Sequence, residues 1–313
     1  VVTIHNGQYQ GWMGWDKSLY IPRWDLWKRG MLDWAGRINP LASGVKCADK
    51  VTTVSWSYMD ELRENANGLE ALFEFEKGKC AGILNGIDNE VWNPSTDTYI
   101  ENRFTVKTVT KGKEQNKKIL CDQFGLDITK PLFVFIGRLV GEKAADILPD
   151  AIRTAIYQTQ GNACFLILGS GETSIEWELQ QMTNEYQGIY NAYIGYNEQL
   201  SHLIYAGADF LLMPSRVEPC GLNQMYAMRY GTVPVVRSTG GLKDTVTDMG
   251  DTDGFGIRFN NATIDDLAYS IGRGVSVYQD KKHMEWMRKY MMQIDHSWES
   301  TVSEYRQVYQ SLK

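Results

Sequence analysis

Apolar and polar residues follow a repeating pattern between residues 131 and 245 of the 313-residue chain. Short apolar runs of strand length are each followed by a longer segment in which apolar residues recur at helical spacing. The first such segment has Ile147, Leu148, Ala151 and Ile152 on one face. Strands that alternate with helices predict a parallel, doubly wound α/β domain with right-handed crossovers. The expected strands are residues 132–136, 164–168, 192–194, 209–213 and 233–236.

The chain before residue 126 has fewer apolar runs, and we expect strands only at residues 1–4, 51–55 and 81–84. A doubly wound sheet usually has about five or six strands. The chain also starts inside an apolar run and without methionine, so we interpret it as a piece of a longer protein. We therefore expect an incomplete first domain with a linker over residues 1–125, a second domain over 126–296, and a terminal helix over 297–313 that packs back toward the first domain.

Two stretches of the first part leave a choice between structure and function. Aromatic residues gather between the first two expected strands, and we interpret them as helix and core packing, with stacking on sugar rings as the alternative. The polar residues 95–118, which include the basic run at residues 111–118, are interpreted as a solvated linker and helix, with a functional basic patch as the alternative. The aromatic residues are Trp12, Trp15, Tyr20, Trp24, Trp27 and Trp34.

Composition and charge narrow the class of protein. The chain is 43% hydrophobic and carries 32 basic against 38 acidic residues, a balance that disfavours nucleic-acid partners. Its apolar runs are much shorter than a membrane span, so no membrane partner is expected. The five cysteines are scattered without a C-x-x-C pair, which indicates reduced thiols in a cytoplasmic protein. The histidines show no metal-ligand spacing, and we assign no metal site.

Candidate chemistry gathers where the expected strands of the second domain end. The carboxyl ends of parallel strands meet at one sheet edge, which is where such sheets bind ligands. After the first strand, Arg138 and Lys143 flank a glycine-containing turn and suit a diphosphate, with surface charges and a helix ion pair as the alternative. After the second strand, Gly169 belongs to a weak glycine-rich phosphate-loop pattern.

The turn at residues 216–226 is the most informative of the three. Glu218 can hydrogen-bond sugar hydroxyls or stabilise positive charge, or it can simply favour the dipole of the following helix. Cys220 is interpreted as a packed small residue rather than a nucleophile. Gly240 and Gly241 would let backbone N–H groups approach a phosphate. In the first domain, His5 ends a strand and is a further candidate.

Motifs along nearly the whole chain resemble, in order, those of bacterial glycogen synthases and plant starch synthases. This family of retaining glucosyltransferases has the GT-B fold, an α/β fold of two Rossmann-like domains, so the first domain is interpreted as incomplete in this chain. The long Arg-x-Glu-Pro-Cys-Gly-Leu match at residues 216–222 is highly specific. The other motifs are Thr3-Ile4-His5-Asn6 with Tyr9-Gln10-Gly11, Val51-Thr52-Thr53-Val54-Ser55, Gly82-Ile83-Leu84-Asn85-Gly86-Ile87-Asp88 with Trp92-Asn93-Pro94, Phe135-Ile136-Gly137-Arg138-Leu139 and Arg237-Ser238-Thr239-Gly240-Gly241-Leu242.

The resemblance implies a role for each matching residue. Arg138 and Lys143 would bind the ADP diphosphate and stabilise it as the leaving group, and Glu218 would hold the hydroxyls of the donor glucose. His5 and Asn85 would reach the glucose from the first domain. Further residues would form the donor and nucleotide pocket, with Tyr196 stacking on adenine; they are Gly169, Tyr196, Cys220, Gly221, Leu222, Asn223, Gly240 and Gly241.

The resemblance also implies the reaction. A glycogen synthase transfers glucose from ADP-glucose to the non-reducing end of an α-1,4-glucan with retention of configuration, without a cofactor or an obligatory metal. Two departures stand out: the family's amino-terminal Lys-Thr-Gly-Gly-Leu loop is absent, and Asn223 replaces a common threonine. The alternatives are a UDP-glucose-dependent or sucrose synthase-like transferase, or an inactive fragment that binds a nucleotide sugar.

Overall fold

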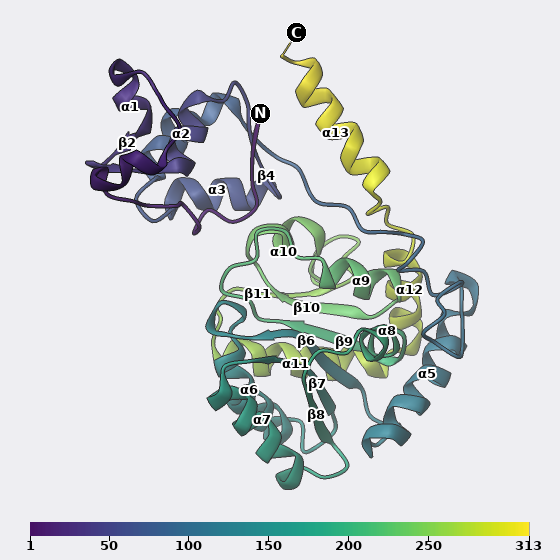
Figure 1. Ribbon diagram of the computed structural model, residues 1–313. Helices are drawn as coiled ribbons and strands as arrows, with labels where there is room; N and C mark the ends of the chain where they lie inside the picture. Colours follow the sequence, from purple (N-terminus) through teal and green to yellow (C-terminus); the bar gives the residue numbers. More distant parts are fainter. Residues whose placement is uncertain (313) are drawn as a thin grey trace. The chain divides into compact units, whose positions relative to one another are not determined.

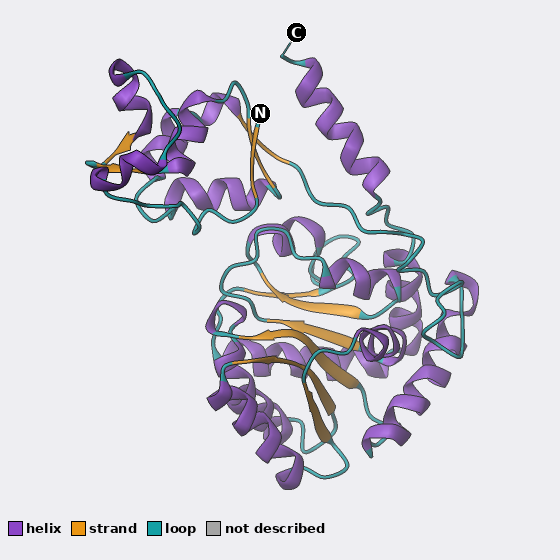
Figure 2. Cartoon of the chain, in the orientation of Figure 1, coloured by secondary structure: helices purple, strands orange, loops and turns teal. Residues whose placement is uncertain are grey.

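The computed structural model describes residues 1–312, and the chain forms two compact units (Figures 1 and 2). One unit comprises Gly86–Trp298, and the other comprises Val1–Asn85 with Glu299–Lys313.

The Gly86–Trp298 unit is built on a parallel six-stranded sheet with the strand order β11-β10-β9-β6-β7-β8. All five strands expected in this region are present, and β11 is a sixth that the pattern missed because it has only three residues. The order reverses beside β6, so the turns after β6 and β9 leave the sheet at neighbouring positions. The strands are β6 (Leu132–Leu139), β7 (Cys164–Gly171), β8 (Tyr190–Ile194), β9 (Phe210–Met213), β10 (Val233–Arg237) and β11 (Ile257–Phe259).

Two of these strands are longer than their apolar runs. β6 and β7 remain paired through Gly137 with Gly169 and Arg138 with Ser170. Gly169 permits this close pairing, because a Cβ atom there would meet the Gly137 carbonyl oxygen at 2.1 Å. Arg138 and Gly169 were expected in the turns, but they lie in the last residues of the strands.

Helices cover both faces of the sheet (Figure 2). They are α5 (Val109–Phe124), α6 (Leu148–Gln158), α7 (Thr173–Glu185), α8 (Glu198–Gly207), α9 (Asn223–Arg229), α10 (Gly240–Thr245), α11 (Ile264–Gln279) and α12 (Lys281–Met291). Short 3-10 turns lie at Val106–Thr108, Gly141–Lys143 and Ala145–Ile147.

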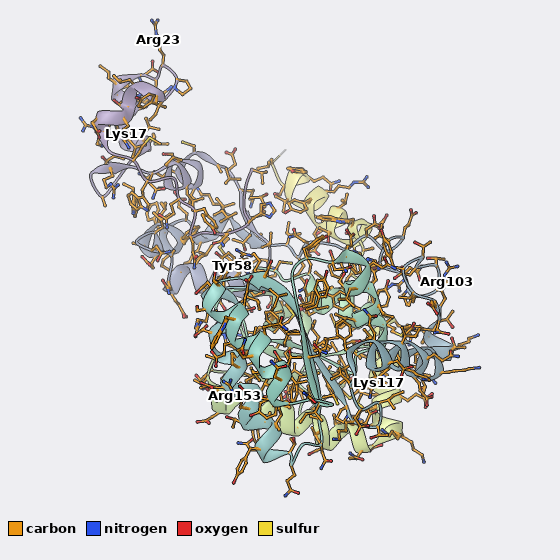
Figure 3. All side chains as sticks on the ribbon, turned by 60° about the horizontal axis from the view of Figure 1, so that its bottom comes forward. Lys17, Arg23, Tyr58, Arg103, Lys117 and Arg153 are labelled. Carbon is orange, nitrogen blue, oxygen red and sulfur yellow. The ribbon has the colours of Figure 1, made fainter. Side chains whose placement is uncertain are left out.

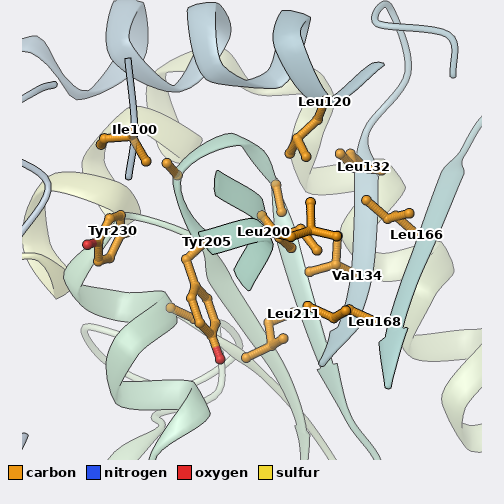
Figure 4. Close-up of a cluster of buried hydrophobic side chains, with 14 of the residues drawn as sticks. Ile100, Leu120, Leu132, Val134, Leu166, Leu168, Leu200, Tyr205, Leu211 and Tyr230 are labelled. Carbon is orange, nitrogen blue, oxygen red and sulfur yellow. The ribbon is translucent and has the colours of Figure 1, made fainter. Parts of the chain in front are cut away.

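Residues 86–125 belong to this unit and not to the first domain, where the sequence analysis placed them. The reason is that α5 packs against α8 with buried residues such as Leu120 and Cys121. Lys113 and Lys117 of α5 are also buried, so the solvated interpretation of the basic run is wrong for these two lysines. Figure 4 shows Leu120 beside Leu132, with Tyr205 and Tyr230 in the same core.

The smaller unit contains a three-stranded parallel sheet with the order β1-β4-β5. Its strands are β1 (Val2–Ile4), β4 (Val51–Thr53) and β5 (Cys80–Gly82), close to the three expected positions, and a short β2 (Asp33–Trp34) and β3 (Arg37–Ile38) hairpin was missed. Its helices are α1 (Arg29–Leu32), α2 (Pro40–Cys47), α3 (Trp56–Glu64), α4 (Glu70–Phe75) and α13 (Trp298–Gln310), with 3-10 turns at Trp15–Tyr20, Leu26–Lys28 and Lys77–Lys79. The Thr301 hydroxyl of α13 donates to the Leu84 carbonyl oxygen at 2.9 Å.

The aromatic stretch of this unit is less buried than expected. Tyr20 and Trp27 are 82% and 80% exposed, so core packing is the wrong interpretation for both. The remaining tryptophans of the stretch are half-buried.

Candidate functional site

The carboxyl ends of β6 and β9 enclose a small polar hollow. It has a volume of about 220 Å³ and is lined by Arg138, Lys143, Ser215, Glu218 and Asn223, together with apolar side chains. Four of these five residues were predicted as site residues, and the structure brings them together from positions up to 85 residues apart in the chain, the separation of Arg138 and Asn223.

An ion pair lies at the centre of this hollow. The Lys143 ammonium donates to Glu218 Oε2 at 2.5 Å, and the Ser215 hydroxyl donates to the same oxygen at 2.9 Å. Glu218 is buried, so its negative charge is held mainly by these two donors. Ser215 was not predicted, although it lies directly before the specific motif. The pair presents one cation and one carboxylate to the same small space, as binding of a charged, hydroxyl-rich ligand requires.

The local backbone explains how Lys143 reaches this position. After β6 the chain makes a 3-10 turn over Gly141–Lys143 and reverses at Ala144, which has a φ of 53°. A left-handed conformation at alanine costs about 1 kcal/mol or more, and the buried surroundings of Ala144 hold it in place.

The Arg138 side chain is more exposed than that of Lys143 and is held less firmly. Its side chain is 63% exposed and its guanidinium lies 3.2 Å from the Glu142 carboxylate. Exposed ion pairs of this kind are weak, at about 0–1 kcal/mol. Arg138 is therefore able to exchange Glu142 for a ligand oxygen.

The three turns around the hollow are tied together by two arginines. Arg216 bonds both oxygens of Asp146 at 2.5 and 2.8 Å and also donates to the Gly141 carbonyl oxygen at 2.6 Å. This bidentate pair lowers the pKa of Asp146 from its usual value, mainly through the hydrogen bond to Arg216. Arg237 donates to the carbonyl oxygens of Ser215 and Arg216 at 2.7 and 2.6 Å. The turns thus form a rigid frame, which is what a preorganised charge site needs.

Gly240 and Gly241, which follow β10, have a packing role that the sequence analysis did not predict. A Cβ atom on Gly240 would meet the Glu218 carbonyl oxygen at 2.1 Å, and one on Gly241 would meet the Cys220 carbonyl oxygen at 2.0 Å. The Gly241 N–H donates to the Glu218 carbonyl oxygen at 3.1 Å, so it is already engaged. In this structure the glycines let two backbones pack closely, and their expected contacts with a phosphate stay predictions.

The rest of the Glu218 turn is shaped by backbone and packing. Cys220 is buried and Gly221 has a left-handed φ of 73°. A Cβ atom at Gly221 would meet Gln224 Oε1 at 2.5 Å. Leu222 lines the hollow, and the Asn223 amide donates to the Ile136 carbonyl oxygen of β6 at 2.7 Å.

A second, larger hollow of about 330 Å³ adjoins the first. Both hollows are lined by Arg138 and Asn223, and the larger one also contacts Gly169 and Tyr196. The Tyr196 side chain is 83% exposed, and its hydroxyl donates to Glu198 Oε2 at 3.1 Å. This hydrogen bond raises the pKa of Tyr196 above its usual value. An aromatic ring at the mouth of a largely apolar hollow can stack on a planar base.

The wall of the larger hollow includes an aromatic stack that sequence reasoning missed. Trp92 lies between His202, at a ring distance of 4.0 Å, and Tyr226, at 3.9 Å. His202 Nδ1 lies 2.7 Å from Asp97 Oδ2 in the core. Trp92 belongs to a motif that was noticed, but its sequence position gives no sign that it faces the hollow.

His5 and Asn85 lie in the smaller unit. His5 is exposed and directly follows β1, and Asn85 is half-buried three residues after β5. Both therefore follow carboxyl ends of strands in one parallel sheet. Their implied contacts with glucose stay predictions.

Two kinds of feature are absent from residues 1–312. No group of three or more metal-ligating side chains has a geometry that could hold an ion. Within the same residues, none of the helices combines the length and the apolar character that crossing a membrane requires.

Two sequence families match the chain. Residues 1–75 match the family described as starch synthase catalytic domain, and residues 130–275 match glycosyl transferases group 1. A glycogen synthase of Flavobacterium johnsoniae is 55% identical over 99% of this chain and 65% of its own length. One from Rhodospirillum rubrum is 40% identical over 99% of this chain and 64% of its own length. The chain thus spans slightly less than two thirds of the length of these relatives.

Two solved structures have a fold similar to that of this chain. The catalytic domain of starch synthase IV from Arabidopsis thaliana, bound to ADP and acarbose, superposes with a TM-score of 0.87 at 34% identity, over 99% of this chain and 66% of that one. An Anabaena protein in complex with UDP superposes with a TM-score of 0.63 at 16% identity, over 87% of this chain and 66% of that one, and it supports the fold alone.

Proposed function

Because this chain belongs to the family of bacterial glycogen synthases and plant starch synthases, with the GT-B fold, we propose that it serves in a glycogen synthase. The protein would transfer glucose from ADP-glucose to the non-reducing end of an α-1,4-glucan with retention. The observation that carries the proposal is the Lys143–Glu218 pair in a small hollow beside a larger one bordered by Tyr196. The similar starch synthase was solved with ADP, which supports ADP-glucose over UDP-glucose as the donor.

The proposed chemistry follows from the charges in the two hollows. The bond between the anomeric carbon and the diphosphate oxygen breaks, and a bond to the acceptor 4-hydroxyl oxygen forms on the same face of the sugar. The hydroxyl proton passes to the departing diphosphate. Lys143 and Arg138 would stabilise the growing negative charge on that diphosphate. Glu218 would hold the glucose hydroxyls and stabilise the positive charge that develops on the ring.

The proposal also covers cofactors, partners and location in the cell. Neither a metal nor a cofactor is required in this scheme, since the cations of Arg138 and Lys143 supply the charge for the leaving group. The partners would be the nucleotide sugar and the glucan, and neither a nucleic acid nor a membrane. We place the reaction in the cytoplasm, where Cys47, Cys80, Cys121, Cys164 and Cys220, which form no disulfide in the described residues, would stay reduced.

A glucose-transfer assay on the full-length protein tests both the choice of nucleotide sugar and the role of Lys143. We expect incorporation of glucose into glycogen from ADP-glucose in preference to UDP-glucose. Lys143→Ala should lower the rate by about 100- to 1,000-fold, because one preorganised donor to the leaving group is lost. Lys118→Ala is the matched control, since Lys118 forms an exposed pair with Asp122 at 2.6 Å on α5. Turnover of Lys143→Ala at the wild-type rate would refute the role assigned to Lys143.

Calorimetry on the 313-residue chain separates binding from catalysis. We expect ADP to bind to this chain and to bind more weakly in Lys143→Ala. ADP binding without transfer by the 313 residues would describe them as the donor-binding portion of the enzyme. Absence of ADP binding in both the 313-residue chain and the full-length protein would overturn the proposal.

A further inference from the structure

A second polar cavity lies at the opposite edge of the large sheet. It has a volume of about 390 Å³ and opens between α5, α11 and α12 at the amino ends of the strands. Asp209 marks this edge, because it directly precedes β9 and accepts a hydrogen bond from the first residue of β6, Leu132, at 2.9 Å. The candidate donor site lies at the other end of β6.

The interior of this cavity carries more positive than negative charge. Lys117 and Arg288 share the single carboxylate of Asp209, at 2.8 and 2.5 Å, and all three residues are buried. Lys113, also buried, lines the same cavity and bonds only uncharged oxygens. Lys117 projects from α5, where it is labelled in Figure 3. Three buried cations thus face one buried carboxylate.

The other charged residues that line the cavity do not neutralise this positive charge. Glu285 is engaged by Lys289 at 2.5 Å, and Glu114 is exposed. Lys281 adds a fourth cation and lies over the Tyr278 ring at 3.5 Å. Buried charges without a counter-charge are costly.

Two hydrogen-bond donors at the cavity are unused. Arg288 is 8% exposed, and its Nε–H has no partner among residues 1–312. Lys281 forms no ion pair within the same described residues. Both donors suit an oxyanion, since guanidinium and ammonium groups bind phosphate oxygens through charge-assisted hydrogen bonds.

We propose that this cavity is an anion site that binds the phosphate group of free phosphate or of a small phosphorylated ligand, separate from the donor site. With Lys113 charged, the buried excess is two positive charges, which matches the charge of a phosphate dianion. Arg288 and Lys281 would donate to its oxygens, and Lys113 and Lys117 would contribute their charge from behind. Burial, reinforced by the charge of Arg288, holds the pKa of Lys113 well below its usual range. A bound dianion would oppose this shift and favour the charged lysine.

The test is a titration with orthophosphate that is monitored by calorimetry. The chains carry Lys143→Ala, which weakens phosphate binding at the donor site. We expect one orthophosphate to bind per chain. Adding Lys281→Met should weaken binding about tenfold, the loss of one charge-assisted bond. Lys282→Met is the matched control, because Lys282 is equally exposed and adjacent but does not line the cavity.

The outcomes decide the proposal independently of the transferase assignment. Absence of orthophosphate binding, or equal weakening by Lys281→Met and Lys282→Met, would overturn it. A repeat titration with a hexose phosphate distinguishes the two ligand sources. Tighter binding than orthophosphate supports a phosphorylated metabolite, and equal binding supports free phosphate.

Discussion

The two edges of the large sheet use charged residues in opposite ways. At the carboxyl edge Arg138 is mostly exposed and Lys143 partly exposed, and both lie in or directly after a strand end. At the amino edge Lys113, Lys117 and Arg288 are buried beneath helices and hold carbonyl oxygens and one carboxylate. The first arrangement leaves cations able to meet a ligand, whereas the second commits most of their donors to the fold.

The comparison shows that a lysine's surroundings, and not its charge, decide its contribution. Lys113 donates to the carbonyl oxygens of Tyr205, Ala206 and Tyr230 at 3.0–3.2 Å and to the Thr232 hydroxyl at 2.7 Å. Three of these carbonyls lie at the carboxyl ends of α8 and α9, where helices leave such groups unpaired and favour positive charge. Lys113 therefore works as a shared cap for two helices.

The largest effect on stability is expected for Asp209→Asn at the amino edge. Removing the shared carboxylate leaves Lys117 and Arg288 buried without a counter-charge, which costs about 3–5 kcal/mol. Urea unfolding at neutral pH measures this loss. Asp122→Asn is the control, because Asp122 pairs with exposed Lys118 and should cost less than about 1 kcal/mol. Equal losses in the two variants would contradict the role of Asp209 as a buried counter-charge.

The same carboxylate predicts how stability depends on pH. Burial by itself would raise the pKa of Asp209, but the cations of Lys117 and Arg288 hold it below the usual value. A lowered pKa means that the stabilisation is complete above the unfolded value of about 3.9 and is lost as the pH falls through the folded value. Urea unfolding between neutral pH and pH 2 should show a steeper acid loss in the wild type than in Asp209→Asn. A parallel pH profile would contradict the assignment.

Lys113→Met should have an intermediate effect. The methionine fills similar space but removes the Lys113 donor from the carbonyl oxygens of Ala206 and Tyr230, while Tyr205 keeps its hydrogen bond from the Thr232 hydroxyl. We therefore expect a loss of about 2–3 kcal/mol. Thermal or urea unfolding gives the value, and Lys111→Met on the exposed face of the same helix is the comparison. If both variants were equally stable, Lys113 would not be a helix cap.

The smallest effect is expected at the carboxyl edge, for Glu142→Gln. The variant removes the carboxylate that pairs with the exposed Arg138 side chain, and pairs with an exposed partner contribute less than about 1 kcal/mol. Unfolding in urea should therefore be nearly unchanged. A loss above about 2 kcal/mol would show that the Arg138 pair is structural and that the two edges are alike.

Much of the fold, and four of the five polar residues that line the small hollow, could be predicted from local patterns. The strands of the large sheet were predicted because each is an apolar run bounded by polar or glycine residues, and periodicity is a local property. Arg138, Lys143 and Glu218 could be grouped because parallel strands deliver their carboxyl ends to one edge. The three-residue β11 and the boundary of the larger unit at residue 86 were missed, since neither is marked by a long apolar run.

The sequence by itself determined the α/β pattern, the specific motif at residues 216–222 and the family to which the chain belongs. Only the tertiary structure decided which charges are buried. Lys117 meets Asp209 across 92 residues of chain, and Lys113 meets Thr232 across 119. It also decided that Gly240 and Gly241 pack against the Glu218 turn. The physical reason is that burial and close contact depend on segments far apart in the chain, whereas helical and strand periodicity depends on neighbours.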